Sequence, residues 1–359
     1  MLKQLDITAL RMRRQFLSTS SDETSYDSLF YNMSPVPTMY WCAPGNPPTL
    51  PLHVDFDDYL YNSKRRSRRD ILKGRFGGGS IAYVTKEDLE LFACLYKKDI
   101  RGLTNTQFEL MKLLEQEGPM NIGLMKEITG MLVKDITPSL HKLQEAFLIF
   151  EDQVDNEGDR GWYLFESEFP EVDLDKYTKN EALQLVVPRL AYLCVFFHET
   201  MIKSYYKLPL KLIKEVLSDL LTNKILQAVT IEGLNGYMLT QDYDSCQDKT
   251  VDNTIDNTVS SILLLQRNDF FVRANADELK VRFTSQWDTL YYLLIDGEFH
   301  GAVMGRFKFG PHVIEDIVLD LSDEEKECRK GEIIEAIYEI FDPQCSPIKR
   351  YDSYDCIQQ

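Results

Sequence analysis

The stretch TNTQFELMKLLEQEGPMNIGLMKEITGMLVKDITPSLHKLQEAFLIFEDQVDNEGDRGWYLFES (residues 104–167) gives the clearest indication of the fold. Thr104 is a good N-cap for a helix over TNTQFELMKLLEQEG, and Gly118 followed by proline ends it. A short helix over NIGLMKEITG follows, and DITPSLHKLQEAF predicts a third helix with Thr137 as its cap and Pro138 in its first turn. FLIFEDQ and RGWYLFES are typical strands joined by the polar loop VDNEGD, so the order is three helices and a β-hairpin.

A similar order returns farther along the chain. KNEALQLVVPRLAYLCVFF and LPLKLIKEVLSDLLTNK predict helices, and ILQAVTIEGLNGYMLT predicts a hairpin that turns between Gly233 and Gly236. Helices followed by a two-stranded wing predict tandem winged helix-turn-helix units. SILLLQ, TLYYLLIDG, EFHGAVMGRFKFG and HVIEDIVLDL then predict strands, and DEEKECRKGEIIEAIYEIF predicts a helix. The expected fold class is therefore α+β, mainly α, with tandem winged helix-turn-helix units and a C-terminal β-rich domain.

A chain of 359 residues is long enough for several domains, and we expect four. The first opens with a helix over LDITALRMRRQFL and continues through the proline-rich YNMSPVPTMYWCAPGNPPTLPLHVDF, which we expect to be extended. The polar stretch from 240 to 260 is expected to be a linker. The expected domains are an N-terminal helical and extended domain at 1–102, a winged helix at 103–176, a second winged helix at 177–244 and an α+β domain, winged-helix-like, at 245–359.

The composition narrows the class of protein. No apolar run approaches the roughly 20 residues that a membrane helix requires, and MLKQLDITALRMRRQFL lacks the features of a signal peptide, so we expect a cytoplasmic protein without a membrane partner. The seven cysteines form no C-x-x-C pair, which predicts reduced thiols rather than zinc ligands, and no cofactor is expected. No His-Glu-x-x-His or Gly-x-Ser-x-Gly motif occurs, so a hydrolase is not indicated.

The segment SKRRSRRDILKGRFGGGSIAYVTKEDLE (residues 63–90) is strongly basic in a chain of net charge -17. Its cations repel one another unless phosphates or carboxylates lie nearby. Three interpretations stay open: contact with nucleic-acid phosphates, docking on the protein's own acidic surface, and a solvated loop. GRFGGGS lacks the lysine of a phosphate-binding loop and predicts a flexible hairpin, after which Thr85 and Asp88 are expected to form a capping box. The seven cations of this basic run are Lys64, Arg65, Arg66, Arg68, Arg69, Lys73 and Arg75.

The third helix of the first unit is the expected recognition element. Its helical spacing turns Leu140, Leu143 and Phe147 toward the core. The loop from 152 to 159 is acidic, so this wing is not expected to lie along a phosphate backbone. Winged helices that act only as structural spacers are an alternative. The outward candidates are Lys134, Ser139, His141, Lys142 and Gln144 on this helix, Lys207, Lys211, Lys214 and Lys224 in the second unit, and Arg267, Arg273, Arg306 and Lys308 beside the C-terminal strands.

Several of these segments together resemble a known family. RDILKGRFGGGSIAYVTKEDLELF, GWYLF, QRNDFFVRANADELKVRF and YYLLIDGEFHGAVMGRFKFGPHVIEDI occur in an order similar to that of the winged-helix DNA-binding family that includes the AlkZ and YcaQ type of DNA glycosylase. The resemblance implies three winged helices around a concave channel that fits DNA. It also implies, for the glycosylases, a Gln-x-Gln or Gln-x-Asp pair after the first helix that positions water and stabilises the sugar cation. The matching region YNMSPVPTMYW has no glutamine, and Gln4-Leu5-Asp6 and Gln153-Val154-Asp155 lie elsewhere in the chain.

The expected function is that of a DNA-binding protein of the tandem winged-helix, AlkZ-like type. It would contact duplex DNA mainly through phosphates, using the basic run, the third helix of the first unit, and Arg306 with Lys308. One alternative is a DNA glycosylase of DNA repair that excises damaged bases with a divergent catalytic motif. Another is a protein-interaction scaffold that binds no nucleic acid.

Overall fold

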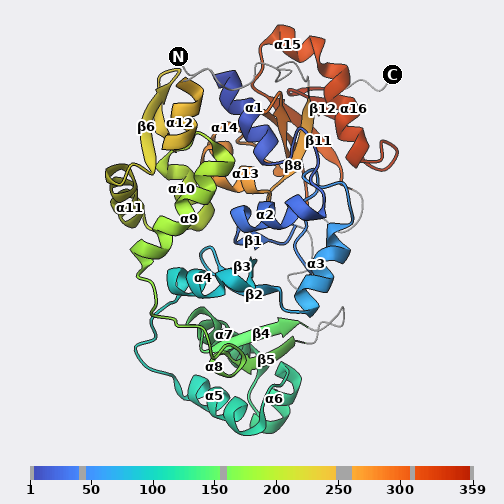
Figure 1. Cartoon of the computed structure of the whole chain (residues 1–359). Coiled ribbons are helices and arrows are strands. Elements are labelled where there is room, and N and C mark those ends of the chain that lie inside the picture. Colours follow the sequence, from blue (N-terminus) through green and yellow to red (C-terminus); the bar gives the residue numbers. More distant parts are fainter. Residues whose placement is uncertain (1–3, 40–45, 154–159, 248–260, 308–311, 356–359) are drawn as a thin grey trace.

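We describe the protein from a computed structural model, which covers residues 4–39, 46–153, 160–247, 261–307 and 312–355 (Figure 1). The fold is a mixture of helices and strands with a β-rich C-terminal sheet. Within these ranges no helix is long and apolar enough to cross a membrane.

The N-terminal segment contains a small antiparallel sheet with the order β1-β3-β2. The predicted first helix and the hairpin at the glycine turn are confirmed, whereas α2 and α3 were not expected. Thr85 precedes the next helical turn but makes no capping hydrogen bond with its side chain, so the predicted capping box is wrong. The elements are α1 (Gln4–Arg14), α2 (Glu23–Met33), β1 (Val36–Pro37), α3 (Asp58–Ser67), β2 (Ile71–Phe76), β3 (Ser80–Thr85), η1 (Lys86–Asp88) and α4 (Leu89–Tyr96).

The first part of the basic run, Lys64 to Arg66, lies in helix α3 and is therefore not a loop. Asp57 caps the helix because its carboxylate accepts the backbone N–H of Leu60 at 2.9 Å. The helical twist then sends neighbouring cations to different sides: Lys64 is exposed, and Arg65 is buried. A helix can therefore separate cations that the sequence places side by side.

The next segment has the expected three helices and hairpin. Thr104 caps α5, as its position predicted, and also forms a capping box with Gln107. Helix α7 begins at Val133 rather than at Thr137, so Pro138 lies inside the helix and not in its first turn. The elements are α5 (Asn105–Glu117), α6 (Ile122–Thr129), α7 (Val133–Glu145), β4 (Ile149–Gln153), β5 (Arg160–Leu164) and α8 (Phe165–Glu168).

The following segment repeats this arrangement. In each segment one antiparallel bridge joins the chain before the second helix to the hairpin: Met120 with Trp162, and Phe197 with Tyr237. Helix α10 was not expected, and α12 occupies the first part of the predicted linker, which is a correction; residues 248–260 lie outside the described ranges. The elements are α9 (Lys179–Cys194), α10 (Glu199–Tyr206), α11 (Leu210–Thr222), β6 (Leu226–Ile231), β7 (Leu234–Leu239) and α12 (Thr240–Gln247).

The C-terminal segment forms a six-stranded sheet with the order β13-β12-β11-β10-β9-β8. The four long predicted strands and the predicted helical region are confirmed, and α13 and α14 are additional. The elements are β8 (Ile262–Gln266), α13 (Phe270–Ala274), α14 (Ala276–Arg282), β9 (Asp288–Ile295), β10 (Glu298–Gly305), β11 (Ile314–Leu319), α15 (Asp323–Cys328), α16 (Lys330–Ile340), β12 (Arg350–Tyr351) and β13 (Tyr354–Asp355).

The hydrophobic core ties these segments together. The largest cluster joins Tyr26 and Phe92 of the N-terminal segment to Tyr205 of α10 and Leu294 of β9. The segment from α5 to β5 has a separate core around Trp162. Figure 1 shows α5 and α6 at one end of the molecule, the C-terminal sheet near the other, and the β2–β3 hairpin between them. The hairpin packs against β1, α3, α4, α7 and β4. The boundaries of the four expected domains stay predictions.

Candidate functional site

Two cations of the basic run are buried inside the protein. Nη1 of Arg65 lies 3.3 Å from Oδ1 of Asp27, and Nζ of Lys73 lies 3.1 Å from Oε1 of Glu151. The two basic side chains are only 7% and 5% exposed. Neither side chain can reach a phosphate at the protein surface. We therefore no longer consider Arg65 and Lys73 as candidate phosphate-binding residues.

Arg69 is held by two carboxylates from the first three-helix segment. Its guanidinium pairs with Asp152 at 3.1 Å and also with Glu168. Burial works against its charge, but the hydrogen bond to Glu168 and the charge of Asp152 raise the pKa of Arg69 above its usual range. Asp152 belongs to the acidic loop noted in the sequence. For these three cations, docking on the protein's own carboxylates is therefore the interpretation that fits.

The remaining cations of the run differ in exposure. Lys64 and Arg68 are exposed, and Arg68 lies 2.9 Å from Asp70. Burial raises the pKa of Tyr83 to about 12, and the charge of the half-buried Arg66 and its hydrogen bond to the Tyr83 hydroxyl act in the opposite direction.

Arg75 links the hairpin to helix α7. Its Nε donates to Oε1 of Gln144 at 2.8 Å, and its Nη1 donates to the carbonyl of Gly79 at 3.1 Å. The side chain of Gln144 is buried, with only 3% of the residue exposed. The prediction that Gln144 points outward is therefore wrong. The amide of Gln144 also donates to Glu151 at 3.3 Å, so it fixes two charged neighbours.

The other candidates on α7 lie on its outer side. Lys134 and Lys142 are exposed, whereas Ser139 and His141 are half-buried. Ser139 Oγ donates to the carbonyl of Asp135 at 2.9 Å, which is a bond within the helix. Leu140, Leu143 and Phe147 face the core, as predicted. At the far end of the fold the exposed Arg306 lies over the Trp287 ring at 4.7 Å, and Lys308 lies outside the described residues.

The tip of the β2–β3 hairpin brings further cations close together. Gly77, Gly78 and Gly79 form the turn with φ values of +63°, +83° and +91°, which glycine adopts without strain. A Cβ atom added at Gly78 would lie 3.1 Å from Cβ of Lys207, and a Cβ atom added at Gly77 would lie 3.4 Å from Nη2 of Arg273. The turn thus packs against the end of α10 and against α13.

Lys207 lies among like charges. Burial lowers the pKa of Lys207 first, and the charges of Arg273, Lys280 and Lys203 lower it further, while Asp277 acts in the opposite direction. Asp277 lies 3.7 Å from Lys203. We call Lys203, Lys207, Arg273 and Lys280 the cation cluster. Because like charges outweigh the one opposing carboxylate at Lys207, an anion placed beside it gains favourable electrostatic energy.

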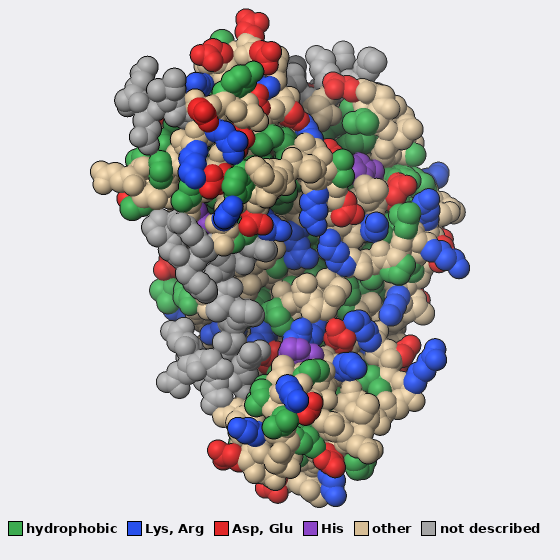
Figure 2. All heavy atoms as spheres, turned by 180° about the vertical axis from the view of Figure 1, so that it is seen from behind, with side chains coloured by type: hydrophobic (Ala, Val, Ile, Leu, Met, Phe, Trp, Pro, Cys, Tyr) green, Lys and Arg blue, Asp and Glu red, His purple; other side chains and the backbone are tan. Residues whose placement is uncertain are grey.

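Figure 2 shows Lys and Arg side chains gathered across the middle of the face opposite to that of Figure 1. The carboxylate of Glu145 borders the glycine turn, because a Cβ atom added at Gly79 would lie 2.8 Å from its Oε1. Glu145 is itself paired with Lys98 at 3.0 Å. The turn therefore lies between the cation cluster and the end of α7, where Lys142 is exposed.

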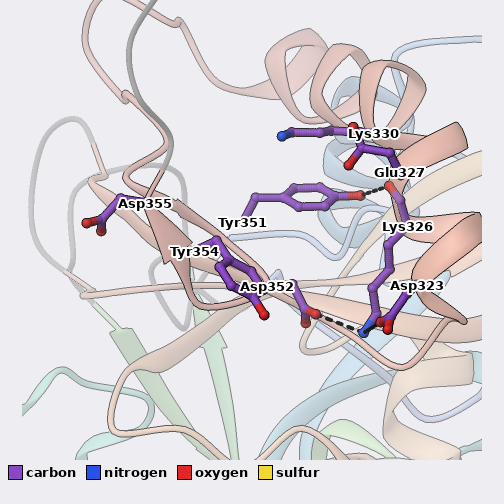
Figure 3. Close-up of a pocket in the computed structure, with 8 residues that line it drawn as sticks. All are labelled: Asp323, Lys326, Glu327, Lys330, Tyr351, Asp352, Tyr354 and Asp355. Atoms are coloured by element: carbon purple, nitrogen blue, oxygen red, sulfur yellow. Dashed lines mark hydrogen bonds and ion pairs between the residues drawn. The ribbon is translucent and has the colours of Figure 1, made fainter.

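A hollow of about 290 Å³ lies in the C-terminal segment (Figure 3). Figure 3 shows Lys326 pointing to Asp352, with which it pairs at 2.8 Å, and the Tyr351 hydroxyl donating to the Lys326 backbone. The other labelled side chains include Lys330 and three carboxylates, those of Asp323, Glu327 and Asp355. With more carboxylates than ammonium groups, this hollow is a poor place for a phosphate.

The cluster was only partly recognisable from the sequence. Lys207 and Arg273 were candidates, but in separate groups, because they are 66 positions apart in the sequence. Lys203 and Lys280 were not singled out. The spacing of Lys203 and Lys207 on one helical face was the available signal. Their approach to the glycine turn depends on tertiary contacts alone.

The comparison with solved structures supports the fold. No family model matches the sequence, and no curated protein matches it. Among solved structures, the Streptomyces sahachiroi DNA glycosylase AlkZ is similar, with a TM-score of 0.63 and 13% sequence identity. The match covers 93% of this chain and 96% of the AlkZ chain. The two proteins thus share an overall fold over nearly their whole lengths.

Proposed function

We propose that this chain, which has the fold of a DNA glycosylase, binds duplex DNA through its phosphates. The observation that carries the proposal is the cation cluster beside the glycine turn in a chain of net charge -17. An acidic protein repels polyanions at long range. A local excess of positive charge on its surface is therefore favoured only if it is neutralised by a bound anion. Phosphates supply the missing negative charge.

In this proposal the two segments of three helices and a hairpin act as tandem winged-helix units. Two observations support it: the element order is shared, and one antiparallel bridge joins each hairpin to the chain before the second helix. The phosphate backbone would run along the cation cluster and past Lys142, with Lys134, Ser139 and His141 on the same helix. Most contacts are then with phosphate, so little sequence specificity is expected.

The test is the salt dependence of binding to a fluorescent duplex, measured by anisotropy. Each phosphate contact contributes a slope of about -0.9 in log K against log salt concentration. The double variant Lys207→Gln/Lys280→Gln should flatten the slope by about 2, because it removes two contacts.

The matched control is Lys64→Gln/Arg68→Gln, which neutralises two exposed cations of the basic run outside the cluster. Its slope should equal that of the wild type. If this control flattens the slope and the cluster variant does not, the basic run is the DNA contact and the cluster is not. If wild-type binding is absent or insensitive to salt, the chain is better explained as a protein-interaction scaffold.

Base excision is a second candidate, favoured by the likeness to AlkZ. The segment after α2, SPVPT, supplies no glutamine and no carboxylate, and its Val36 and Pro37 are held in β1. Incubation with an alkylated duplex, followed by chromatography of free bases, tests this candidate. We expect no release above that of the bare duplex; release dependent on the protein would establish an enzyme.

A further inference from the structure

A cavity of about 380 Å³ lies between the end of helix α16 and strand β9. Three ring side chains line it: Tyr291 of β9, His312 just before β11, and Phe341, which directly follows α16. Leu290 and Ile340 add apolar surface. Sites for small ligands measure about 300–1,000 Å³ and are mostly apolar. The cavity is therefore large enough for a small ligand or for one long side chain of a partner.

The ring of Phe341 stands at right angles to the two other rings. The ring centroids of Tyr291 and Phe341 are 5.6 Å apart with an interplanar angle of 89°, and those of His312 and Phe341 are 6.2 Å apart with an angle of 86°. We call these three residues the aromatic corner. A flat ligand fits between parallel rings, whereas walls at right angles suit a rounded group.

The aromatic corner is held in place by its own contacts. Phe341 is buried, and its backbone N–H donates to the carbonyl of Ile337 at 3.0 Å. His312 packs at 90° against Phe307, and the guanidinium of Arg267 lies over the Phe307 ring at 5.4 Å. The outer ring of this set thus already contacts a cation. Because the walls are ordered before a ligand arrives, binding there costs little ordering entropy.

A carboxylate borders the aromatic corner. Among the described residues that line the cavity, Asp342 supplies the one carboxylate, and none is a lysine or an arginine. The Asp342 carboxylate accepts the backbone N–H of Gln344 at 2.8 Å, and its hydrogen bond with the Cys345 thiol raises the pKa of that thiol. Asp342 is exposed, so the cavity opens to solvent beside a negative charge. This charge favours a cationic ligand.

We propose that this cavity binds a trimethylammonium group. Aromatic rings attract cations, and sets of rings recognise quaternary ammonium ions. A plain ammonium ion is strongly hydrated and donates hydrogen bonds, which ring surfaces satisfy poorly. A trimethylammonium group is rounded and has no N–H, so it fits the aromatic corner, and the carboxylate of Asp342 attracts its charge. The site is independent of the proposed DNA binding.

A trimethylammonium group occurs in choline-like small molecules and in methylated lysine side chains, and two probes separate these sources. The full chain is titrated with choline and with its uncharged isostere dimethylbutanol, in which carbon replaces nitrogen, and binding is followed by saturation-transfer NMR of the methyl signal. The second probe is a short dye-labelled peptide with one trimethyllysine, compared by anisotropy with the same peptide carrying unmodified lysine.

The variants remove one wall or the charge. Tyr291→Leu removes a ring but keeps an apolar side chain on β9. Asp342→Asn changes an exposed residue and keeps an oxygen that can accept the N–H of Gln344, so the fold should tolerate it. Glu335→Gln is the matched control, because it removes an exposed carboxylate of α16 outside the cavity lining.

Choline should bind the wild type and Glu335→Gln equally, and dimethylbutanol should bind both at least roughly ten-fold more weakly. Tyr291→Leu should weaken choline binding roughly two- to thirty-fold, the range for one cation–π contact. Asp342→Asn should weaken it about five-fold. Tighter binding of the trimethyllysine peptide than of choline would identify a methylated protein as the source, and binding of choline alone would identify a small molecule. Equal binding of choline and dimethylbutanol, unchanged affinity in both cavity variants, or no binding of either trimethylammonium probe would overturn the inference.

Discussion

The ammonium group of Lys73 lies 3.1 Å from the carboxylate of Glu151, with both side chains withdrawn from solvent. Lys73 is on β2 and Glu151 is on β4, so the pair joins the central hairpin to the first three-helix segment. A charge buried without its partner is strongly destabilising, because the interior does not replace the lost hydration. Lys73, although it belongs to the basic run, therefore has a structural role in the fold.

Replacing Lys73 by Met should lower the free energy of unfolding by about 3–5 kcal/mol, since the buried Glu151 then loses the ammonium group 3.1 Å from its carboxylate. Urea denaturation followed by circular dichroism measures the change. The double variant Lys73→Met/Glu151→Leu should recover most of the loss. A single variant as stable as the wild type would contradict the structural role of this pair.

The stability of the protein should depend on the protonation of His53. Burial lowers the pKa of His53, but the charge of Asp269 and the hydrogen bonds to Asp269 and Gln15 outweigh it, and the pKa is raised above 6.5. A raised folded-state pKa contributes stability that is complete below the unfolded value and is lost as the pH rises through the folded value.

The free energy of unfolding should therefore fall as the pH increases above 6.5. His53→Gln should lack this part of the pH dependence, because its side chain does not titrate. Denaturation series at several pH values compare the two proteins. Parallel pH profiles for wild type and variant would contradict the assignment of an imidazolium.

Lys207 should be unusually reactive toward acylating reagents. Its pKa is lowered by burial and by the neighbouring cations, so more of it is the neutral amine, which is the nucleophile. Brief labelling followed by peptide mass spectrometry should modify Lys207 faster than the exposed Lys64. Excess duplex DNA should protect Lys207 and leave Lys64 unchanged. Equal rates at both lysines, or protection of Lys64 alone, would count against the cation cluster as the binding surface.

Gly78 should not tolerate a side chain. Its φ of +83° disfavours any L-residue, and a new Cβ would lie 3.1 Å from Cβ of Lys207. Gly78→Ala should lower stability by about 1–2 kcal/mol. Gly331→Ala is the matched control, because a Cβ there meets nothing within 4 Å and the residue lies in helix α16. The control should be neutral or stabilising by about 0.4–1 kcal/mol.

Local patterns predicted the elements that depend on neighbouring residues. Thr104, and the glycines at 77–79, act within a few positions, so the N-cap of α5 and the β2–β3 hairpin followed from the sequence. Helix α3 was missed because repulsion between adjacent cations was weighed without the distant carboxylates that relieve it. Gln144 was placed on the wrong side for the same kind of reason, since its partner Arg75 is far away in the sequence.

The sequence by itself determined those elements that capping, glycine turns and apolar periodicity specify over a few residues, but not α2, α3, α10, α13 or α14. Only the tertiary structure decided which cations are neutralised. Asp27, Asp152 and Glu168 reach the basic run from remote segments, while Lys207 and Arg273 meet at a glycine turn. The reason is physical: the energy of a charge depends on its distance from every other charge and on its burial, and the linear sequence specifies neither.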